Sequence, residues 1–171
     1  MLYSPKWSKA KKRLKSFTFE SLRSRVDFQV INFRRAHDQL GRAVITVDKL
    51  EKLNMCTITA EKEEYYRERA IRKQLDDFNF DDRLNNLALQ EQAIYAQYDF
   101  FSALEIYFET PIEDCLKSKD ILLKILCLLD RRLGKRTLMK MNDTITEEHP
   151  LVQDFFRLRC EAENVRVAVL K

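Results

Sequence analysis

The most apolar stretch of the chain covers residues 120–133 and reads DILLKILCLLDRRL. On a helical wheel Asp120, Lys124 and Arg131 share one narrow polar stripe, while leucine and isoleucine cover nearly all the rest. Such a helix is either buried in a core or spans a membrane, and this run is too short and too charged to cross a bilayer. The pattern predicts a buried central helix over residues 120–133, which Gly134 ends at the position after its C-cap.

Alternation of apolar and polar residues with a period of two predicts an antiparallel meander before that helix. Residues 26–30 alternate, and the parity shifts at Ile31, which indicates a bulge or a strand buried on both faces. Residues 42–47 form a second run, joined to the first by a polar loop over residues 34–41, and residues 52–57 form a third. Three such strands need a helical layer on one face to be stable.

Helical periodicity covers most of the remaining chain and predicts about five helices around the central one. Only two glycines and three prolines interrupt 171 residues, which also favours helix. The predicted helices lie near residues 59–75, 84–95, 100–108, 111–117 and 149–163. The first of them is charged almost all round, so it should lie at the surface, held by Tyr65, Tyr66, Ala70 and Ile71.

These elements together predict an α+β protein with one domain over residues 1–171, because no glycine- or serine-rich linker divides the chain. A basic helix and the meander occupy residues 1–58, and the helical part occupies residues 59–164. Residues 165–171 read as a strand by composition, and the sequence leaves open whether they form a strand or a tail.

The N-terminal segment predicts a basic amphipathic helix over residues 5–16. One apolar stripe recurs at helical spacing through Trp7, Ala10, Leu14 and Phe17. The other faces carry five candidate phosphate-binding cations, Lys9, Lys11, Lys12, Arg13 and Lys15. Helices of this kind bind nucleic acid or anionic lipid, or simply place a solvated face over a packed stripe.

The net charge of +4 conceals three blocks of opposite sign. Residues 1–47 carry 11 basic and 3 acidic residues, residues 48–115 carry 8 and 16, and residues 116–171 carry 12 and 8. Such blocks face different partners or compensate one another within the fold. Mutual compensation is the simpler interpretation, so we expect only weak, non-specific binding of nucleic acid.

Neither targeting nor metal chemistry is indicated. No apolar segment of a signal peptide follows the early charges and no membrane span is visible, so we expect a cytoplasmic protein that does not enter a membrane. The four cysteines are widely spaced without a CxxC pair, which is typical of buried free thiols. We expect no metal and no cofactor.

No catalytic motif is present, and two glycines exclude a glycine-rich phosphate cradle. His37 and Asp38 lie among arginines in the predicted loop and would suit proton transfer, but a polar turn explains them more simply. His149 precedes Pro150 and is better explained as the residue that opens the last helix. We therefore do not expect an enzyme.

Two surfaces are candidates for binding a macromolecule. A nucleic-acid surface would combine the basic helix with the arginines of the hairpin, Arg34, Arg35 and Arg42. A protein-binding surface would use the tract DDFNFDD beside the charged helix 59–75, with candidate residues Asp76, Asp77, Phe78, Phe80, Asp81 and Asp82. Aromatic anchors within a polar rim are typical of protein interfaces.

Three segments carry a resemblance to a known family: FRRAHDQLGRAVITVD (33–48), LLDRRLGKRTL (128–138) and HPLVQDFFRLRCEAE (149–163). The chain resembles a family of small uncharacterised bacterial cytoplasmic proteins. That resemblance implies a single-domain protein and assigns neither an activity nor a catalytic residue. In the second segment Arg131, Arg132, Lys135 and Arg136 should lie at a helix C-terminus, where cations complement the dipole, and Asp130 should pair with one of them. A site for a phosphate or carboxylate is the alternative, but the structural interpretation needs no ligand.

The sequence thus favours a non-enzymatic bacterial protein that acts through protein–protein interaction. The alternative is a nucleic-acid-binding protein that uses helix 5–16 and the loop 34–42. The partner, the pathway and the oligomeric state are left open by the residues alone.

Overall fold

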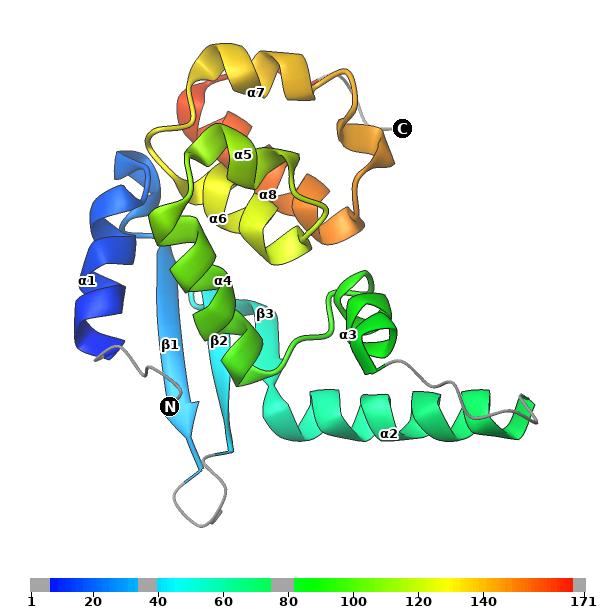
Figure 1. Ribbon diagram of the computed structural model, residues 1–171. Helices are drawn as coiled ribbons and strands as arrows, with labels where there is room; N and C mark the ends of the chain where they lie inside the picture. Colours follow the sequence, from blue (N-terminus) through cyan, green and yellow to red (C-terminus); the bar gives the residue numbers. More distant parts are fainter. Residues whose placement is uncertain (1–6, 34–39, 75–81, 168–171) are drawn as a thin grey trace.

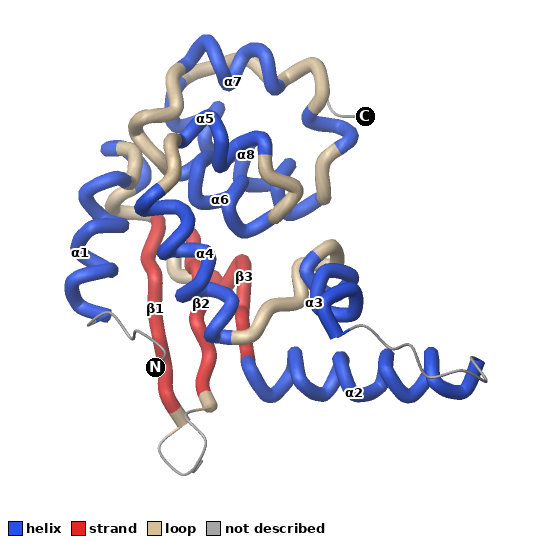
Figure 2. The backbone as a smooth tube through the Cα atoms, in the orientation of Figure 1, coloured by secondary structure: helices blue, strands red, loops and turns tan. Residues whose placement is uncertain are grey.

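The computed structural model describes residues 7–33, 40–74 and 82–167. Over these residues the protein is α+β, with a three-stranded antiparallel sheet and eight α-helices, as Figure 1 shows. Helices α1 (Trp7–Phe17) and α4 (Gln97–Glu109) lie beside the sheet, and the later helices form a layer at one end of it (Figures 1 and 2). The predicted fold class is confirmed.

The meander has the order β1-β2-β3. Its strands are β1 (Val26–Asn32), β2 (Gly41–Val47) and β3 (Leu50–Cys56). Asp48 and Lys49 join β2 to β3 with positive φ angles of 51° and 68°, the two-residue geometry whose twist matches that of a hairpin.

The parity shift at Ile31 does not mark a bulge in β1. β1 pairs with β2 in one continuous register, and the irregularity lies between Ile45 and Thr46, where β2 pairs with β3. Ile31 lies on the side of the strand that faces away from the core and is 37 % exposed. Both alternatives predicted for β1, a bulge and burial on both faces, were therefore wrong.

The helical half begins with α2 (Thr57–Gln74) and α3 (Asp82–Gln90), which lie to one side of the sheet in Figure 1. After α4 come α5 (Ile112–Lys117), α6 (Ile121–Leu129), α7 (Lys135–Met141) and α8 (Pro150–Glu163). Two short 3-10 helices occupy Glu20–Leu22 and Ile145–Glu147. None of the helices in the described ranges is both long and apolar enough to cross a membrane.

The helix α6 is central, as the apolar wheel predicts. Eight of its nine residues are buried, and it packs on α4, α5 and α8. Its N-terminus is capped by Asp120, whose carboxylate accepts the Leu122 N–H at 2.8 Å. The same carboxylate accepts the phenolic O–H of the buried Tyr95 at 2.9 Å, which ties α6 to the segment before α4.

The central helix ends at Leu129, four residues earlier than predicted. Asp130 turns the chain into an extended conformation, with ψ at 131°, because its side chain and backbone are held by residues from elsewhere in the fold. Gly134 has a φ of −81° and is the N-cap of α7, so it is not the C-terminal stop that the sequence indicated.

The two ends of the described chain pack on the core. Ala10 and Leu14 on α1 are buried, which confirms the apolar stripe of that helix. His149 caps α8 as predicted, since its Nδ1 accepts the Leu151 N–H at 3.1 Å. Residues 165–167 are not a strand but continue from a left-handed C-cap at Asn164, and residues 168–171 lie outside the described part.

The first prediction concerns this core. Leu126→Ala should lower the free energy of unfolding by about 2–5 kcal/mol, because truncation of a buried leucine loses transfer energy and leaves a cavity. Met139→Ala is the control, since Met139 is 57 % exposed on α7 and its truncation should cost about 0.5 kcal/mol or less. Urea unfolding measures both changes, and equal shifts in the two variants would show that α6 is not central.

Candidate functional site

Two cations of the basic helix are engaged by the sheet. The ammonium groups of Lys11 and Lys15 lie 3.1 and 3.2 Å from the Asp27 carboxylate on β1, and Lys15 also donates to the carbonyl oxygen of Val26 at 2.5 Å. Burial raises the pKa of Asp27, but hydrogen bonds from Lys11 and Lys15 outweigh it and lower the pKa. These two lysines therefore hold α1 against β1.

The other three cations of α1 lie on its solvent side. Arg13 stacks over the Phe108 ring at 4.3 Å, donates to the Phe108 carbonyl oxygen and pairs with Glu109 at 3.7 Å. Lys9 and Lys12 are exposed, and neither forms an ion pair with any residue that the structure describes. The basic helix is thus only partly compensated from within the fold.

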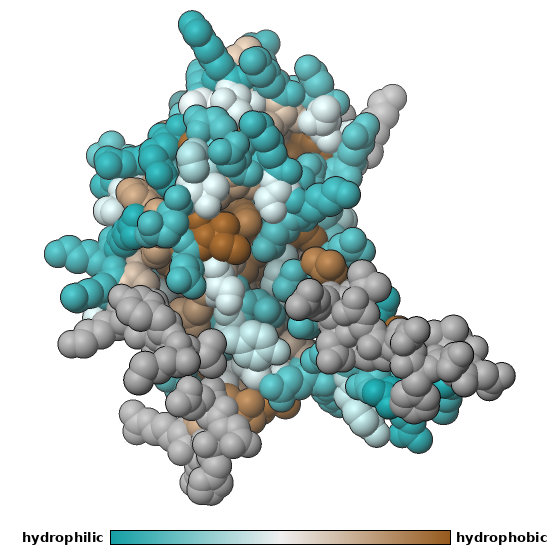
Figure 3. Space-filling model, in the orientation of Figure 1, coloured by the Kyte–Doolittle hydropathy of each residue, from teal (hydrophilic) through white to brown (hydrophobic). Residues whose placement is uncertain are grey.

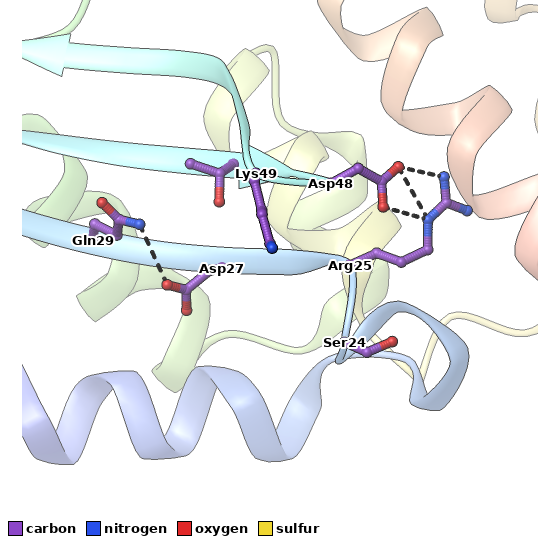
Figure 4. Close-up of a pocket in the computed structure, with 7 residues that line it drawn as sticks. Ser24, Arg25, Asp27, Gln29, Asp48 and Lys49 are labelled. Atoms are coloured by element: carbon purple, nitrogen blue, oxygen red, sulfur yellow. Dashed lines mark hydrogen bonds and ion pairs between the residues drawn. The ribbon is translucent and has the colours of Figure 1, made fainter.

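A polar hollow of about 420 Å³ lies beside α1, at the end of the sheet where a tight turn joins β2 to β3 (Figure 4). It is lined by Ser24, Arg25, Asp27, Gln29, Thr46, Asp48 and Lys49. In Figure 4 the Arg25 and Asp48 side chains point toward each other, and their closest approach is 2.8 Å. Both carboxylates of the hollow are already paired with cations, so it offers no uncommitted base for proton transfer.

A buried polar cluster lies where α6 ends. Asp130 is fully buried, and its carboxylate accepts bonds from the Arg132 guanidinium at 2.6–3.1 Å and from the Tyr107 hydroxyl. The predicted pairing of Asp130 with a neighbouring arginine is confirmed. Burial raises the pKa of Tyr107, and the hydrogen bond to Asp130 raises the pKa of Arg132.

Arg159 on α8 completes this cluster and was missed by the sequence reading. Its guanidinium is fully buried and donates to the carbonyl oxygens of Leu128 (3.3 Å), Asp130 (2.7 Å) and Leu133 (2.9 Å). It also lies 3.8 Å from the centre of the Phe19 ring. These carbonyls include some that the end of a helix leaves without partners, so Arg159 caps α6 from inside the core.

A second set of contacts joins the end of α1 to the same turn. The Phe19 N–H donates to Leu129 at 2.8 Å, the Arg131 N–H donates to Phe17 at 2.7 Å, and Thr18 forms a β-bridge with Asp130. Segments more than 100 residues apart in sequence therefore lie side by side.

The cations of segment 128–138 are divided between two elements. Arg131 and Arg132 follow α6, but Lys135 and Arg136 open α7, so their predicted place at a helix C-terminus was wrong. Arg132 lies 4.1 Å and Arg13 lies 5.7 Å from the centre of the Phe17 ring. The turn and α1 thus present their cations on neighbouring surfaces.

The helices α2 and α3 form an arm that extends from the body (Figure 1). Among the α2 side chains that the structure describes, only Thr57 and Ala60, in the first turn, are buried. The half-buried residues Glu64, Arg67, Glu68 and Ile71 recur at i, i+3, i+4 and i+7, and Asn85 of α3 donates to the Glu64 carbonyl oxygen, so this stripe faces α3.

The opposite stripe of α2 faces solvent and combines aromatic, apolar and basic groups. We call it the outer stripe, and it comprises Ile58, Lys62, Tyr65, Tyr66, Arg69 and Lys73. Tyr65 and Tyr66 are 57 % and 52 % exposed, their rings lie 5.8 Å apart, and the Lys62 ammonium lies 5.8 Å from the Tyr66 ring. The prediction that these two tyrosines hold the helix was therefore wrong. On the face shown in Figure 3, hydrophilic residues dominate and apolar ones are scattered.

Several predicted site residues lie outside the described part of the chain. These are Arg34, Arg35 and His37 of the hairpin loop, and Asp76, Asp77, Phe78, Phe80 and Asp81 of the acidic tract. Asp82 begins α3, and Arg42 lies on β2, where it pairs with Glu51 at 2.9 Å. Over residues 7–33, 40–74 and 82–167, no group of His, Cys, Asp and Glu side chains is arranged to hold a metal ion.

With this geometry in view, comparison with known proteins gives one match. Residues 6–160 match the sequence pattern of the SF0329 protein family, which covers most of the chain. The chain belongs to the SF0329 protein family. The matched range includes the Asp130 cluster, α1 and most of α8, and the family description names no activity. No curated protein and no solved structure matches the chain.

The second prediction tests the cap on α6. Arg159→Met should lower the free energy of unfolding by about 3–5 kcal/mol, because it removes a buried charge and leaves its polar partners unsatisfied. Arg157→Met, on the same helix, is the matched control, since the Arg157 side chain is 52 % exposed and its pair with Asp154 contributes about 1 kcal/mol or less. Equal losses in chemical denaturation would contradict the role of Arg159.

The third prediction concerns the thiols. Cys56 should react with a thiol reagent much faster than Cys115, Cys127 and Cys160, which are buried. Burial raises the pKa of Cys56, but hydrogen bonds from Thr59 and Ile58 together outweigh it and lower the pKa, whereas burial raises that of Cys160 to about 11. Mass spectrometry of the native protein over time measures the order, and early labelling of Cys127 would show that the α5–α6 face opens.

Proposed function

We propose that this protein is a non-enzymatic interaction protein that binds another protein through the outer stripe of α2. The observation that carries the proposal is the exposure of α2 beyond its first turn. We further propose that the protein works in the bacterial cytoplasm, and its four free cysteines support a reducing compartment.

An exposed helix of this kind lacks its usual source of stability. Most helical stability in proteins comes from packing one face of the helix on a core. α2 packs one stripe on the short helix α3 and leaves the opposite stripe in solvent. A bound partner would supply the missing contacts.

The outer stripe has the composition of an interface anchor. Tyrosine is enriched at binding hot spots because its ring buries a large area while its hydroxyl keeps a polar partner. Lys62 and Arg69 flank Tyr65 on the same stripe. The chemistry fits a partner surface with an apolar pocket for the tyrosine rings and carboxylates for the two cations.

A catalytic role has less support. The described carboxylates of the hollow and of the Asp130 cluster are paired with cations, and the only histidine in the described ranges, His149, caps α8. None of these groups combines an uncommitted base with a neighbouring nucleophile, which is the arrangement that acyl or phosphoryl transfer requires.

The fourth prediction tests the stripe by photo-crosslinking in the native cell. A benzoylphenylalanine in place of Tyr65 should form a discrete protein adduct, because this position lies in the proposed interface. The same probe in place of Met139 should not, although both positions are 57 % exposed. Lys62→Glu with Arg69→Glu should remove the Tyr65 adduct without lowering the melting temperature, since both side chains are exposed.

The pattern of adducts decides the proposal. A position-specific, charge-sensitive adduct supports the proposed interface. Equal adducts from both probe positions, an adduct that survives charge reversal, or no adduct from Tyr65 would each contradict it.

A further inference from the structure

We infer that a second surface of this protein, on the side of α1, binds the phosphate backbone of duplex nucleic acid. We call this surface the basic face, and it comprises Lys9, Lys12 and Arg13 of α1 with Arg131, Lys135 and Arg136 of the α6–α7 turn. The inference does not depend on the outer stripe of α2, because the two surfaces share no residue.

The fold, and not the sequence order, assembles the basic face. The bridge between Thr18 and Asp130 and the bond from the Arg131 N–H to Phe17 bring the turn against the end of α1. Figure 1 shows the connection between α6 and α7 passing near the end of α1. Arg13 and Arg132 both lie over the Phe17 ring, which links the two groups of cations.

Most of these charges have no structural task. Lys9, Lys12, Arg131, Lys135 and Arg136 are exposed, and none forms an ion pair with any residue in the described ranges. Lys11 and Lys15, which do hold the fold together, point to Asp27 on another side of α1. The helix therefore separates structural lysines from unpaired ones.

Two of the cations are placed where they weaken their own helix. Lys135 and Arg136 stand in the first turn of α7, which contains no acidic residue. The N-terminal end of a helix carries partial positive charge, so cations there are unfavourable. Like charges on one side of a protein also repel one another, and a bound polyanion relieves that repulsion.

The chemistry of the face favours duplex nucleic acid over a membrane. A helix that binds lipid inserts an apolar face into the bilayer. The apolar stripe of α1 is packed on the core, and none of the exposed large apolar side chains in the described chain lies on α1. The basic face therefore offers a membrane charged groups but no apolar side chains to insert into the bilayer.

The basic face also lacks the exposed aromatic rings on which single-stranded nucleic acid stacks its bases. Proteins that bind single-stranded nucleic acid stack bases on exposed aromatic rings. Phe17, the aromatic residue at the centre of the face, is half-buried and lies under two guanidinium groups. Contacts to phosphates alone are independent of base sequence, so we expect affinity in the non-specific range, about 10⁻⁴–10⁻⁶ M at physiological salt.

The fifth prediction is measured by fluorescence anisotropy with a labelled duplex of about 20 base pairs, between about 50 and 200 mM salt. Each phosphate contact contributes about 0.9 to the slope of log K against log salt. Arg131→Gln with Lys135→Gln and Arg136→Gln should therefore reduce the slope by about two to three and weaken binding at least about tenfold at the lowest salt. Adding Lys9→Gln and Lys12→Gln should reduce it further.

The control removes the same charge elsewhere. Lys52→Gln with Lys117→Gln and Lys119→Gln changes three exposed cations on β3 and around the α5–α6 connection, and it should leave the slope unchanged. Thermal melts confirm that each variant is folded. An equal effect of both triple variants, no effect of either, tighter binding of a single strand, or binding to anionic phospholipid vesicles instead of the duplex would each overturn the inference.

Discussion

The guanidinium of Arg159 lies where the parts of the helical body meet. A helix ends with carbonyl groups that its own backbone cannot satisfy, and a buried helix such as α6 cannot leave them to water. Arg159 donates to three carbonyls at this end and stacks on Phe19, while Glu163 lies 3.4 Å away and balances the charge. Burial lowers the pKa of Arg159, but arginine stays protonated in proteins, so the charge is present and must be compensated.

That contact determines the position of elements far from α8. Because Arg159 and Arg132 fix the backbone and side chain of Asp130, the chain after α6 turns outward and can bridge to Thr18. The bridge anchors α1 and sets the basic face beside it. The core and the two proposed binding surfaces are thus different kinds of region. Most polar groups of the Asp130 cluster are paired, although Arg159 Nε and Glu163 Oε2 are buried without a hydrogen-bond partner. The outer stripe of α2 and most cations of the basic face are left to solvent.

The sequence predicted those features that depend on local periodicity. The meander, the stripe of α1 and the burial of α6 each follow from the spacing of apolar residues within one segment. The end of α6 did not, because Arg131 and Leu133 still fit the polar stripe and the apolar side of the wheel, although Asp130 and Arg132 do not. What stops the helix is the binding of Asp130 by Tyr107, Arg132 and Arg159, two of which are remote in sequence.

The same reasoning explains what was missed at the candidate sites. Arg159 follows Phe155 and Phe156 by one helical turn, so the sequence places it on the apolar side of α8. The local sequence does not predict the backbone carbonyl groups to which it donates, because they belong to α6 and the turn that follows it. The charged residues of α2 predicted a helix at the surface. How much of the helix is exposed depends on which other elements pack on it, and this is not encoded within the segment. The joining of α1 to the turn at Arg131 is a tertiary event that no single segment encodes.

Native-state hydrogen exchange of backbone amides tests this account most directly. The amides of Phe19 and Arg131, which bond across the junction of α1 and α6, should exchange only through global unfolding. The amides of α2 beyond its first turn, from Tyr65 onward, should exchange by local opening with a much smaller free energy. Protection of Tyr65 and Tyr66 equal to that of Phe19 and Arg131 in the isolated protein would contradict the account.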